Sequence, residues 1–495
     1  MLSLHDGYAR VISGWLAGQK LKSGVKVFKG IPYASAPTGN LRWKAPEPPA
    51  EWSGIREAYE FGPEAVQEGM LRSLGTQAVS EDCLYLNIWT PAGNITDKLA
   101  VLVWIHGGSL LEGAGSNFLY EGSKLAETGI VIVTINYRLG IFGFLAHPQL
   151  TAESGDNSSG NYGLLDQLMA IKWVRENIGQ FGGDPGRITL GGQSAGALCA
   201  GALLASQKAG GLFQRAILQS GPPFGLGEFY SRLAEEERTG ENFFKAMGVK
   251  NIAELRLKPT AEIFKKSRDI SFMARITVGG RLLADYPGRL ICEGKYQKVP
   301  VLLGGVSHEF SDKYSPVEGL SENKYIDIVR KQYGSYSTKL LELYPPAGDI
   351  ANARTAIRME AHKLMTGAEI VAKAVAGDGG DAYLYYFCRA VSKEENYFYG
   401  ANHSSELPFL FHLADRGNIF PWDVRSWEKA DYEYSKSMMA FWSNFVRKGD
   451  PNGKNLPVWS KYGMDNPKIL AFGDEIKEIQ DLESFNFAAF EDILL

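Results

Sequence analysis

Short runs of apolar residues, each bounded by glycine or polar turns, recur along this chain of 495 residues. Their length and their content of β-branched residues predict buried strands. The predicted strands occupy residues 99–108, 130–138, 187–192, 215–221, 299–305 and 381–390. Between the second and third runs, apolar residues recur three or four positions apart from Leu164 to Ile178, which predicts one apolar face of a helix. Strands that alternate with helices predict an α/β fold with a mostly parallel sheet flanked by helices.

Two segments, around 225–290 and 312–370, are richer in charge and read as helical. We expect them to be excursions from the sheet that form a cap, not separate domains. No low-complexity linker or internal repeat interrupts the chain. Residues 1–495 are therefore predicted to form a single domain.

The composition is that of an ordinary globular protein, with 45% apolar residues, 22% charged residues and a net charge of −4. No block of like charges favours nucleic acid or a membrane surface as a partner. His5, Asp6 and Arg10 fall where a signal peptide needs an apolar core, and no apolar run is long enough to span a bilayer. We expect a soluble, cytoplasmic protein, either a monomer or a small homo-oligomer. Its four widely spaced cysteines are expected to be free thiols.

The only G-x-S-x-G pattern in the chain places Ser194 between Gly192 and Gly196. A predicted strand precedes it, and the alanine- and leucine-rich "AGALCAGALLAS" that follows predicts a helix. A strand, a tight turn and a helix are the setting of a nucleophile elbow, in which glycines avoid steric collision and the serine is exposed. The alternative is a serine that only caps the helix.

A serine nucleophile needs a base, and His403 is the candidate because it lies in a Gly-Ala loop between aromatic clusters. Glu309 is the candidate acid, since it follows the strand at 299–305 and so lies at the carboxyl edge of the sheet, where α/β enzymes place active sites. Its alternative reading is a solvated loop carboxylate. His308 is not expected to pair with Glu309, because neighbouring side chains on an extended loop diverge.

The stretch "WIHGGSLLEG" ends a predicted strand with small residues, Gly107, Gly108 and Ser109, whose backbone amides could face inward. Such amides, together with that of Ala195 after the serine, would form an oxyanion hole. The alternative is a plain glycine turn that leaves a strand.

These motifs resemble those of the type B carboxylesterases, a family that includes bacterial p-nitrobenzyl esterases, cholinesterases and liver carboxylesterases. The E-D-C-L-Y-L-N motif is specific, and similar stretches span most of the chain. They include residues 30–49, 80–91, 188–197 and 441–453.

The resemblance implies an α/β-hydrolase fold and a serine carboxylesterase that hydrolyses carboxylic esters through an acyl-enzyme, without metal or cofactor. The implied site residues are Ser194 as nucleophile, His403 as general base and acid, Glu309 as orienting acid, and Gly108, Ser109 and Ala195 as oxyanion-hole residues.

Three departures from the family pattern stand out. Gln193 replaces the usual glutamate before the nucleophile, which removes support for cationic substrates of the cholinesterase kind. Ser109 replaces a glycine, so its Cβ would add strain at a positive φ. Cys83 lacks its usual disulfide partner, because Ala65 occupies that position.

The expected substrates are small to medium or aryl esters. A lipase or an amidase with the same triad stays open as an alternative, as does a non-catalytic cholinesterase-like binding module. Three aromatic clusters could line an apolar pocket or belong equally well to the core, and they occupy residues 222–230, 396–400 and 419–422.

Overall fold

Each of the six predicted strand segments overlaps a strand in the computed structural model, which describes residues 3–73, 75, 77–390, 398–414, 427–479 and 483–495. These strands are β7 (Leu99–Ile105), β8 (Val131–Ile135), β9 (Gly183–Gln193), β10 (Arg215–Gln219), β13 (Val301–Val306) and β14 (Ala382–Phe387). The predicted amphipathic helix is α5 (Tyr162–Asn177), which a short 3-10 turn extends to Phe181. The aromatic cluster at 419–422 and the first two residues of the cluster at 396–400 lie outside the described residues.

The chain forms two compact units. The first contains residues 1–217, 227–299 and 442–451, and the second contains residues 218–226, 300–441 and 452–495. Strand β10 begins in the first unit and ends in the second, and α15 (Lys429–Lys448) begins in the second and ends in the first.

The first unit contains a ladder of strands in the order β9-β7-β8-β6-β4-β3. The last three strands of this order are β6 (Tyr85–Thr90), β4 (Lys26–Pro32) and β3 (Gln19–Lys20). Strand β7 pairs in parallel with β8 and β9, whereas β6 pairs antiparallel with β8 and β4. Sequence patterning missed β4, because a register shift between Phe28 and Ile31 interrupts the alternation of its side chains.

Two small sheets complete the strands of the first unit. They are formed by β1 (Tyr8–Val11), β2 (Gly14–Ala17) and β5 (Ile55–Glu57), and by β11 (Tyr230–Arg232) and β12 (Ile276–Val278).

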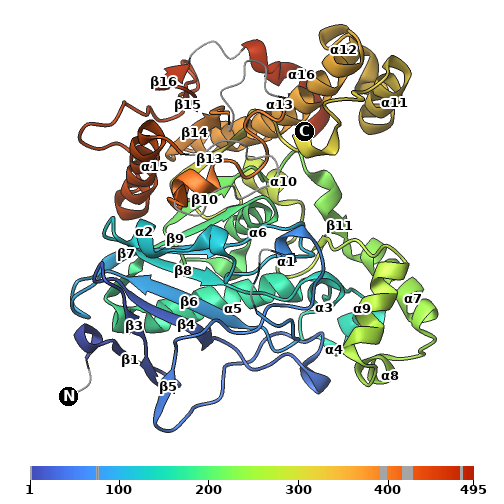
Figure 1. Cartoon of the computed structure of the whole chain (residues 1–495). Coiled ribbons are helices and arrows are strands. Elements are labelled where there is room, and N and C mark those ends of the chain that lie inside the picture. Colours follow the sequence, from blue (N-terminus) through green and yellow to red (C-terminus); the bar gives the residue numbers. More distant parts are fainter. Residues whose placement is uncertain (1–2, 74, 76, 391–397, 415–426, 480–482) are drawn as a thin grey trace. The chain divides into compact units, whose positions relative to one another are not determined.

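Helices α5 and α6 of the first unit pack on strand β9, and α6 also packs on β7 (Figure 1). Every residue of α6 is buried, because its alanines and glycines allow the helix backbone to approach the strands closely. The helices of this unit are α1 (Met70–Ser73), α2 (Ser123–Ala126), α3 (Gly140–Phe144), α4 (Pro148–Glu153), α5, α6 (Ala195–Leu204), α7 (Leu233–Met247), α8 (Ile252–Arg256), α9 (Thr260–Asp269) and α10 (Pro287–Cys292).

Two buried ion pairs lie in the first unit, and the second of them joins charged residues of two sequence motifs. Arg138 donates from Nε and Nη2 to Asp166 at 2.8 and 2.7 Å, and both side chains are almost fully buried. Arg42 binds Glu81, the first residue of the E-D-C-L motif, with the same two-pronged geometry. Such pairs fix the loops that carry them, since removal of one partner leaves a buried charge uncompensated.

The second unit contains the parallel strands β13, β14 and β15 (Ile469–Phe472), and β16 (Ile476–Ile479) pairs antiparallel with β15. The long helix α13 (Asp349–Gly377) packs on β13 and β14, with α11 and α16 against it (Figure 1). The other helices of this unit are α11 (Glu322–Tyr333), α12 (Ser337–Leu343), α14 (Leu407–Leu410) and α16 (Phe487–Leu494).

The two charge-rich segments are mostly helical, as predicted, with α7 to α10 in the first and α11 to α13 in the second, but the first also contains the short strands β11 and β12. Figure 1 shows α7, α8 and α9 grouped together. Their role as a cap stays a prediction.

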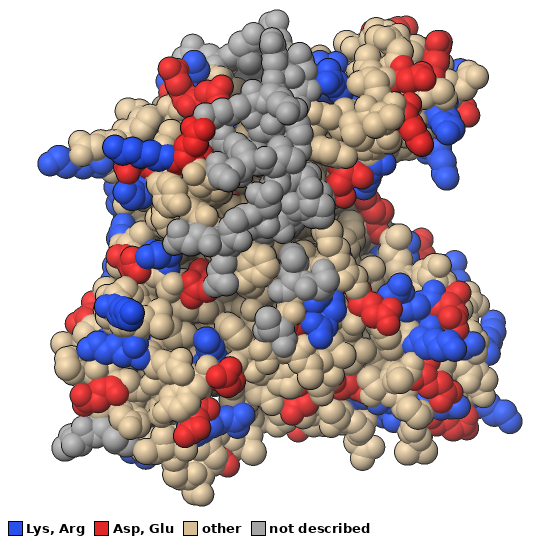
Figure 2. All heavy atoms as spheres, in the orientation of Figure 1, with Lys and Arg blue, Asp and Glu red and all other residues tan. Residues whose placement is uncertain are grey.

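Positive and negative side chains intermingle on the described part of the face in Figure 2. Among the helices of the described residues, none combines the length and the apolar character that a bilayer crossing requires. All four cysteines are free thiols, as predicted, and Cys83 and Cys199 are buried.

Candidate active site

Ser194 lies in the one-residue turn between β9, which ends at Gln193, and α6, which begins at Ala195. Its backbone has φ +57° and ψ −129°, a conformation that residues with a side chain rarely adopt. A Cβ atom on Gly192 would lie 2.5 Å from the backbone of Gly196, and one on Gly196 would overlap the Ile105 carbonyl oxygen. The predicted elbow is therefore present, and its two glycines are required by close backbone contact.

The loop after β7 lies directly against this elbow. A Cβ atom on Gly107 would lie 2.8 Å from the Gln193 carbonyl oxygen and 3.0 Å from Cβ of Ser194. Gly108 and Ser109 both have positive φ, +108° and +56°. The strain that the sequence suggested for Ser109 is thus present.

The amides of Gly108, Ser109 and Ala195 donate no hydrogen bond to any acceptor in the described part of the chain. The Gly108 carbonyl, by contrast, accepts from Leu111 and Glu112 at 2.9 and 3.0 Å, which closes the loop into a turn. Three amides without a protein acceptor beside a strained serine are a suitable set of donors for an oxyanion.

His106 and Gln67 hold this loop in place. The Tyr137 hydroxyl donates to the His106 carbonyl at 3.1 Å, and the two rings stack with centroids 4.5 Å apart. Burial lowers the pKa of His106 to about 4, so its imidazole is neutral near pH 7 and has a structural role. The side-chain amide of Gln67 donates to the Gly113 carbonyl at 2.9 Å and accepts from the Gly113 amide at 2.7 Å.

Glu309 and His403 lie together in the second unit. Glu309 follows β13 and is fully buried, and its Oε1 accepts the Val306 amide at 3.1 Å. Its Oε2 lies 2.5 Å from Nδ1 of His403. Burial opposes protonation of the imidazole, yet the charge and hydrogen bond of Glu309 dominate and raise the pKa of His403 above its usual value. The solvated alternative for Glu309 was wrong.

Asn402, which the sequence reasoning missed, orients His403. Its Oδ1 accepts the amides of His403 and Ser311 at 2.8 and 3.0 Å. The Phe310 ring stacks on the imidazole, with centroids 4.4 Å apart. His308 turns away and contacts Ser307 at 2.8 Å, so the predicted absence of a His308–Glu309 pair is confirmed.

Glu406 is a second buried carboxyl group that the sequence reasoning missed. Its Oε1 accepts from the Gln219 amide at 3.1 Å. Burial, together with the charge of Glu309, raises the pKa of Glu406 to about 7. The signal in the sequence was a glutamate three residues after His403, directly before the apolar run at 407–411.

A cavity of about 590 Å³ opens beside the loop after β7, which is the predicted oxyanion loop, and Gly108 and Ser109 of this loop line it. Its volume is typical of a small-molecule site. Phe264 and Phe272 are its aromatic wall, and neither belongs to the aromatic clusters singled out in the sequence. The apolar part of the lining comprises Val66, Leu111, Ile141, Phe264, Phe272 and Met273.

No group of three or more His, Cys, Asp or Glu side chains in the described ranges has the arrangement of a metal site. The predicted site residues thus fall into two sets. Ser194 lies with the amides that are predicted to form the oxyanion hole in the first unit, and His403 lies with Glu309 in the second.

Comparison with known proteins gives consistent matches over nearly the whole chain. A model of the carboxylesterase family matches residues 8–488. Fumonisin B1 esterase of Sphingopyxis macrogoltabida is 34% identical over 482 residues, which cover 93% of this chain and 85% of the relative. Para-nitrobenzyl esterase of Bacillus subtilis (strain 168) is 32% identical over 488 residues, which cover 94% of each chain.

Among solved structures, a carboxylesterase of Geobacillus stearothermophilus matches with a TM-score of 0.85 and 33% sequence identity. The match covers 98% of this chain and 100% of that chain. The predicted α/β-hydrolase fold, with a large, mixed and mostly parallel sheet flanked by helices, is confirmed.

Proposed function

Because the chain belongs to the carboxylesterase family, we propose that Ser194, His403 and Glu309 form its catalytic triad. The protein is a carboxylic ester hydrolase. The observation that carries the assignment is the 2.5 Å contact between Nδ1 of His403 and the fully buried Glu309. A carboxylate at Nδ1 fixes the imidazole tautomer, so that Nε2 is the nitrogen that exchanges a proton with the nucleophile.

In the proposed reaction, the Ser194 hydroxyl attacks the ester carbonyl while His403 takes its proton. His403 then gives this proton to the leaving alcohol, and Ser194 is left acylated. Water, deprotonated by the same imidazole, attacks the acyl-enzyme and releases the acid.

The negative charge of each tetrahedral intermediate lies on the former carbonyl oxygen. In the proposal, hydrogen bonds from the amides of Gly108, Ser109 and Ala195 stabilise this charge. Their support is the lack of any acceptor for them among the described residues. One such donor is worth about 3 kcal/mol of transition-state stabilisation.

For the substrate, we propose small to medium or aryl esters. A cavity of about 590 Å³ with an apolar wall suits such groups, and Phe264 and Phe272 offer faces for an aryl ring. The Bacillus subtilis relative is named for a para-nitrobenzyl ester. Faster turnover at an oil interface would favour the lipase alternative, and cleavage of anilides at rates near those of esters would favour the amidase alternative.

Trapping of the acyl-enzyme tests the triad. A 4-nitrophenyl ester is mixed with the enzyme, the reaction is stopped within one turnover, and the acylated peptide is identified by mass spectrometry. We expect the added mass on the peptide that contains Ser194 and none in Ser194→Ala. Acylation at another residue, or continued hydrolysis by Ser194→Ala, contradicts the assignment. If no residue becomes acylated, the result favours the non-catalytic cholinesterase-like binding module.

Four further expectations rest on the sequence and are proposed with the function: a single catalytic domain, a cytoplasmic location, a monomer or small homo-oligomer, and no nucleic-acid partner. Cell fractionation and light scattering test the second and third.

A further inference from the structure

The cavity beside the oxyanion loop contains two carboxylates, Glu68 and Glu112, and one guanidinium, Arg268. Glu68 and Arg268 form an ion pair of 2.9 Å at the solvent boundary, where their side chains are 66% and 58% exposed. These two charges offset each other and are screened by water. The charge that remains in the cavity is that of Glu112.

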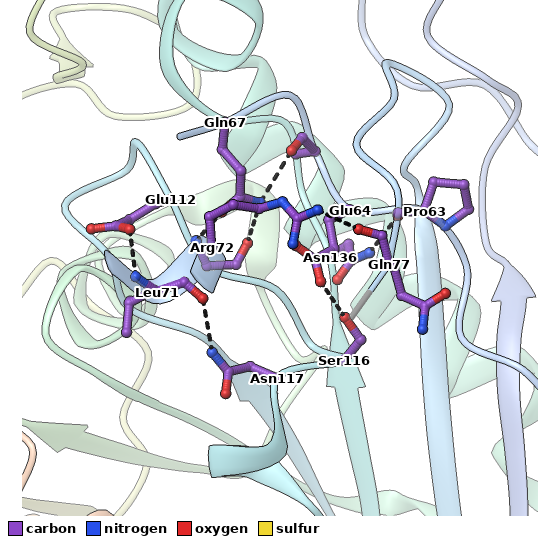
Figure 3. A network of polar contacts seen from close by, with 12 residues as sticks. Pro63, Glu64, Gln67, Leu71, Arg72, Gln77, Glu112, Ser116, Asn117 and Asn136 are labelled. Carbon is purple, nitrogen blue, oxygen red and sulfur yellow. Dashed lines mark hydrogen bonds and ion pairs between the residues drawn. The ribbon is translucent and has the colours of Figure 1, made fainter. Parts of the chain in front are cut away.

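Glu112 lies between the oxyanion loop and the segment that begins α1. Its Oε2 accepts the Leu71 amide at 2.7 Å, as Figure 3 shows. A Cβ atom on Gly69 would overlap this carboxylate, and one on Gly108 would lie 3.1 Å from Cγ of Glu112. The carboxylate is therefore a close neighbour of the loop whose amides are proposed to bind the oxyanion.

No lysine or arginine in the described part of the chain forms an ion pair with Glu112. The guanidinium of Arg72 points toward Glu64 and the Gln77 carbonyl, away from Glu112, and interacts with them (Figure 3). Burial raises the pKa of Glu112, and the backbone amides of Leu71 and Arg72 only partly oppose this. A half-buried carboxylate without a counter-ion is costly, and beside an oxyanion it is also repulsive.

A cation supplied by the substrate removes both costs. We propose that Glu112 is a specificity-determining residue that selects esters bearing an ammonium group near the carbonyl. This inference rests on the oxyanion hole proposed above. In this proposal Glu112, from the loop after β7, provides the preference for cations that the neutral Gln193 was expected to remove.

The competing explanation is structural, because Glu112 also holds the Leu71 amide. Two variants separate the roles. Glu112→Gln keeps an acceptor for this amide and removes the charge, whereas Glu112→Asp keeps a charge in the cavity. Glu68→Gln is the matched control, since it removes the other carboxylate of the same cavity from an exposed position.

The measurement is the ratio of kcat/KM for a cationic ester to that for its neutral isostere. In one pair the cationic group and its neutral counterpart lie in the alcohol: 2-(trimethylammonio)ethyl butanoate is compared with 3,3-dimethylbutyl butanoate. In the other pair they lie in the acyl group: the 4-nitrophenyl esters of 4-(trimethylammonio)butanoic and 5,5-dimethylhexanoic acids are compared. We expect Glu112→Gln to lower the ratio about tenfold in at least one pair, and Glu112→Asp and Glu68→Gln to change it less than threefold.

The wild-type preference is also expected to weaken as salt is raised from about 0.02 to 0.5 M. The inference is overturned if Glu112→Gln lowers both members of each pair equally, or if Glu68→Gln lowers the ratio as much. If the wild-type enzyme hydrolyses the neutral esters but its ratio of cationic to neutral kcat/KM is near one, this inference is overturned and the proposed function is not. Absence of any Ser194-dependent hydrolysis of the neutral esters overturns the proposed function, and this inference with it.

Discussion

His403 and Glu309 form a close acid–base pair, with 2.5 Å between Nδ1 and Oε2, in which the carboxylate is fully buried and the imidazole side chain is 15% exposed. Burial by itself would lower the pKa of this imidazole, but the negative charge of Glu309 raises it instead. The protonated form that must exist after proton transfer from a serine is thereby stabilised.

The first prediction concerns the pH dependence of kcat/KM. Only unprotonated His403 can act as a base, so a raised pKa places the acid limb of the profile at a higher pH than an ordinary histidine gives. Glu309→Gln removes the charge and leaves burial, which favours the neutral ring. We expect the acid limb to move to lower pH and the rate at the optimum to fall on the order of 10⁴-fold. An acid limb that stays in place in Glu309→Gln means that another group titrates.

The second prediction concerns the strained backbone of Ser194. Ser194→Ala and Ser194→Gly both remove the hydroxyl, and each should lose on the order of 10⁶ in kcat. Only glycine relaxes φ +57°, so Ser194→Gly should be more stable than Ser194→Ala by about 1 kcal/mol. Urea unfolding of the two inactive variants measures this difference. If the two variants have equal stability, the backbone conformation at position 194 does not lower the free energy of unfolding.

The third prediction concerns Ser109, whose φ of +56° lies in the loop of the proposed oxyanion hole. Ser109→Gly removes the Cβ and should stabilise the protein by about 1 kcal/mol. Ser109→Val puts a β-branched residue into the same backbone and should displace the amide, with a loss of roughly 10² in kcat. Kinetics and unfolding of both variants test this, and a valine variant with a normal kcat shows that the amide at 109 is not used.

The fourth prediction concerns Glu406, whose pKa is raised from 4.5 to about 7. Between these values the folded state holds a proton that the unfolded state has lost, so stability falls as the pH rises through this interval. The loss amounts to about 3 kcal/mol, and Glu406→Gln should abolish it.

His403 adds a slope of the same sign, because its pKa is also raised on folding. The comparison is therefore made in a His403→Gln background, with and without Glu406→Gln, by urea unfolding at pH 5 and pH 8. A slope that persists unchanged in the double variant assigns the titration to another group.

The sequence predicted the elements that carry the site because their patterns are local. A strand, a glycine turn and an alanine-rich stretch identified the elbow at Ser194, and the end of an apolar run placed Glu309 at the edge of a sheet. Strand β4 was not predicted, because the register shift between Phe28 and Ile31 breaks its two-residue period.

Residues that act through distant contacts could not be found in this way. Asn402 and Glu406 matter because they meet groups far away in the chain, such as Ser311 and Gln219. Glu112 looked like any loop carboxylate, since nothing local tells that its charge lacks a partner. The aromatic wall of the cavity also lies in a segment, near Phe264, that reads as an ordinary charged helix.

The pairing of β7 with β9 sets the accuracy of the proposed chemistry. Ile105 is opposite Gly192 in this parallel ladder, one residue before the oxyanion loop and two residues before Ser194. A slip by one residue would displace the loop from the serine by about 3.3 Å, far beyond what a hydrogen bond tolerates. The register of these two strands thus fixes the distance between the nucleophile and the proposed oxyanion donors. Side chains elsewhere in the cavity are then free to diversify, and new ester specificities can evolve without realigning the reacting groups.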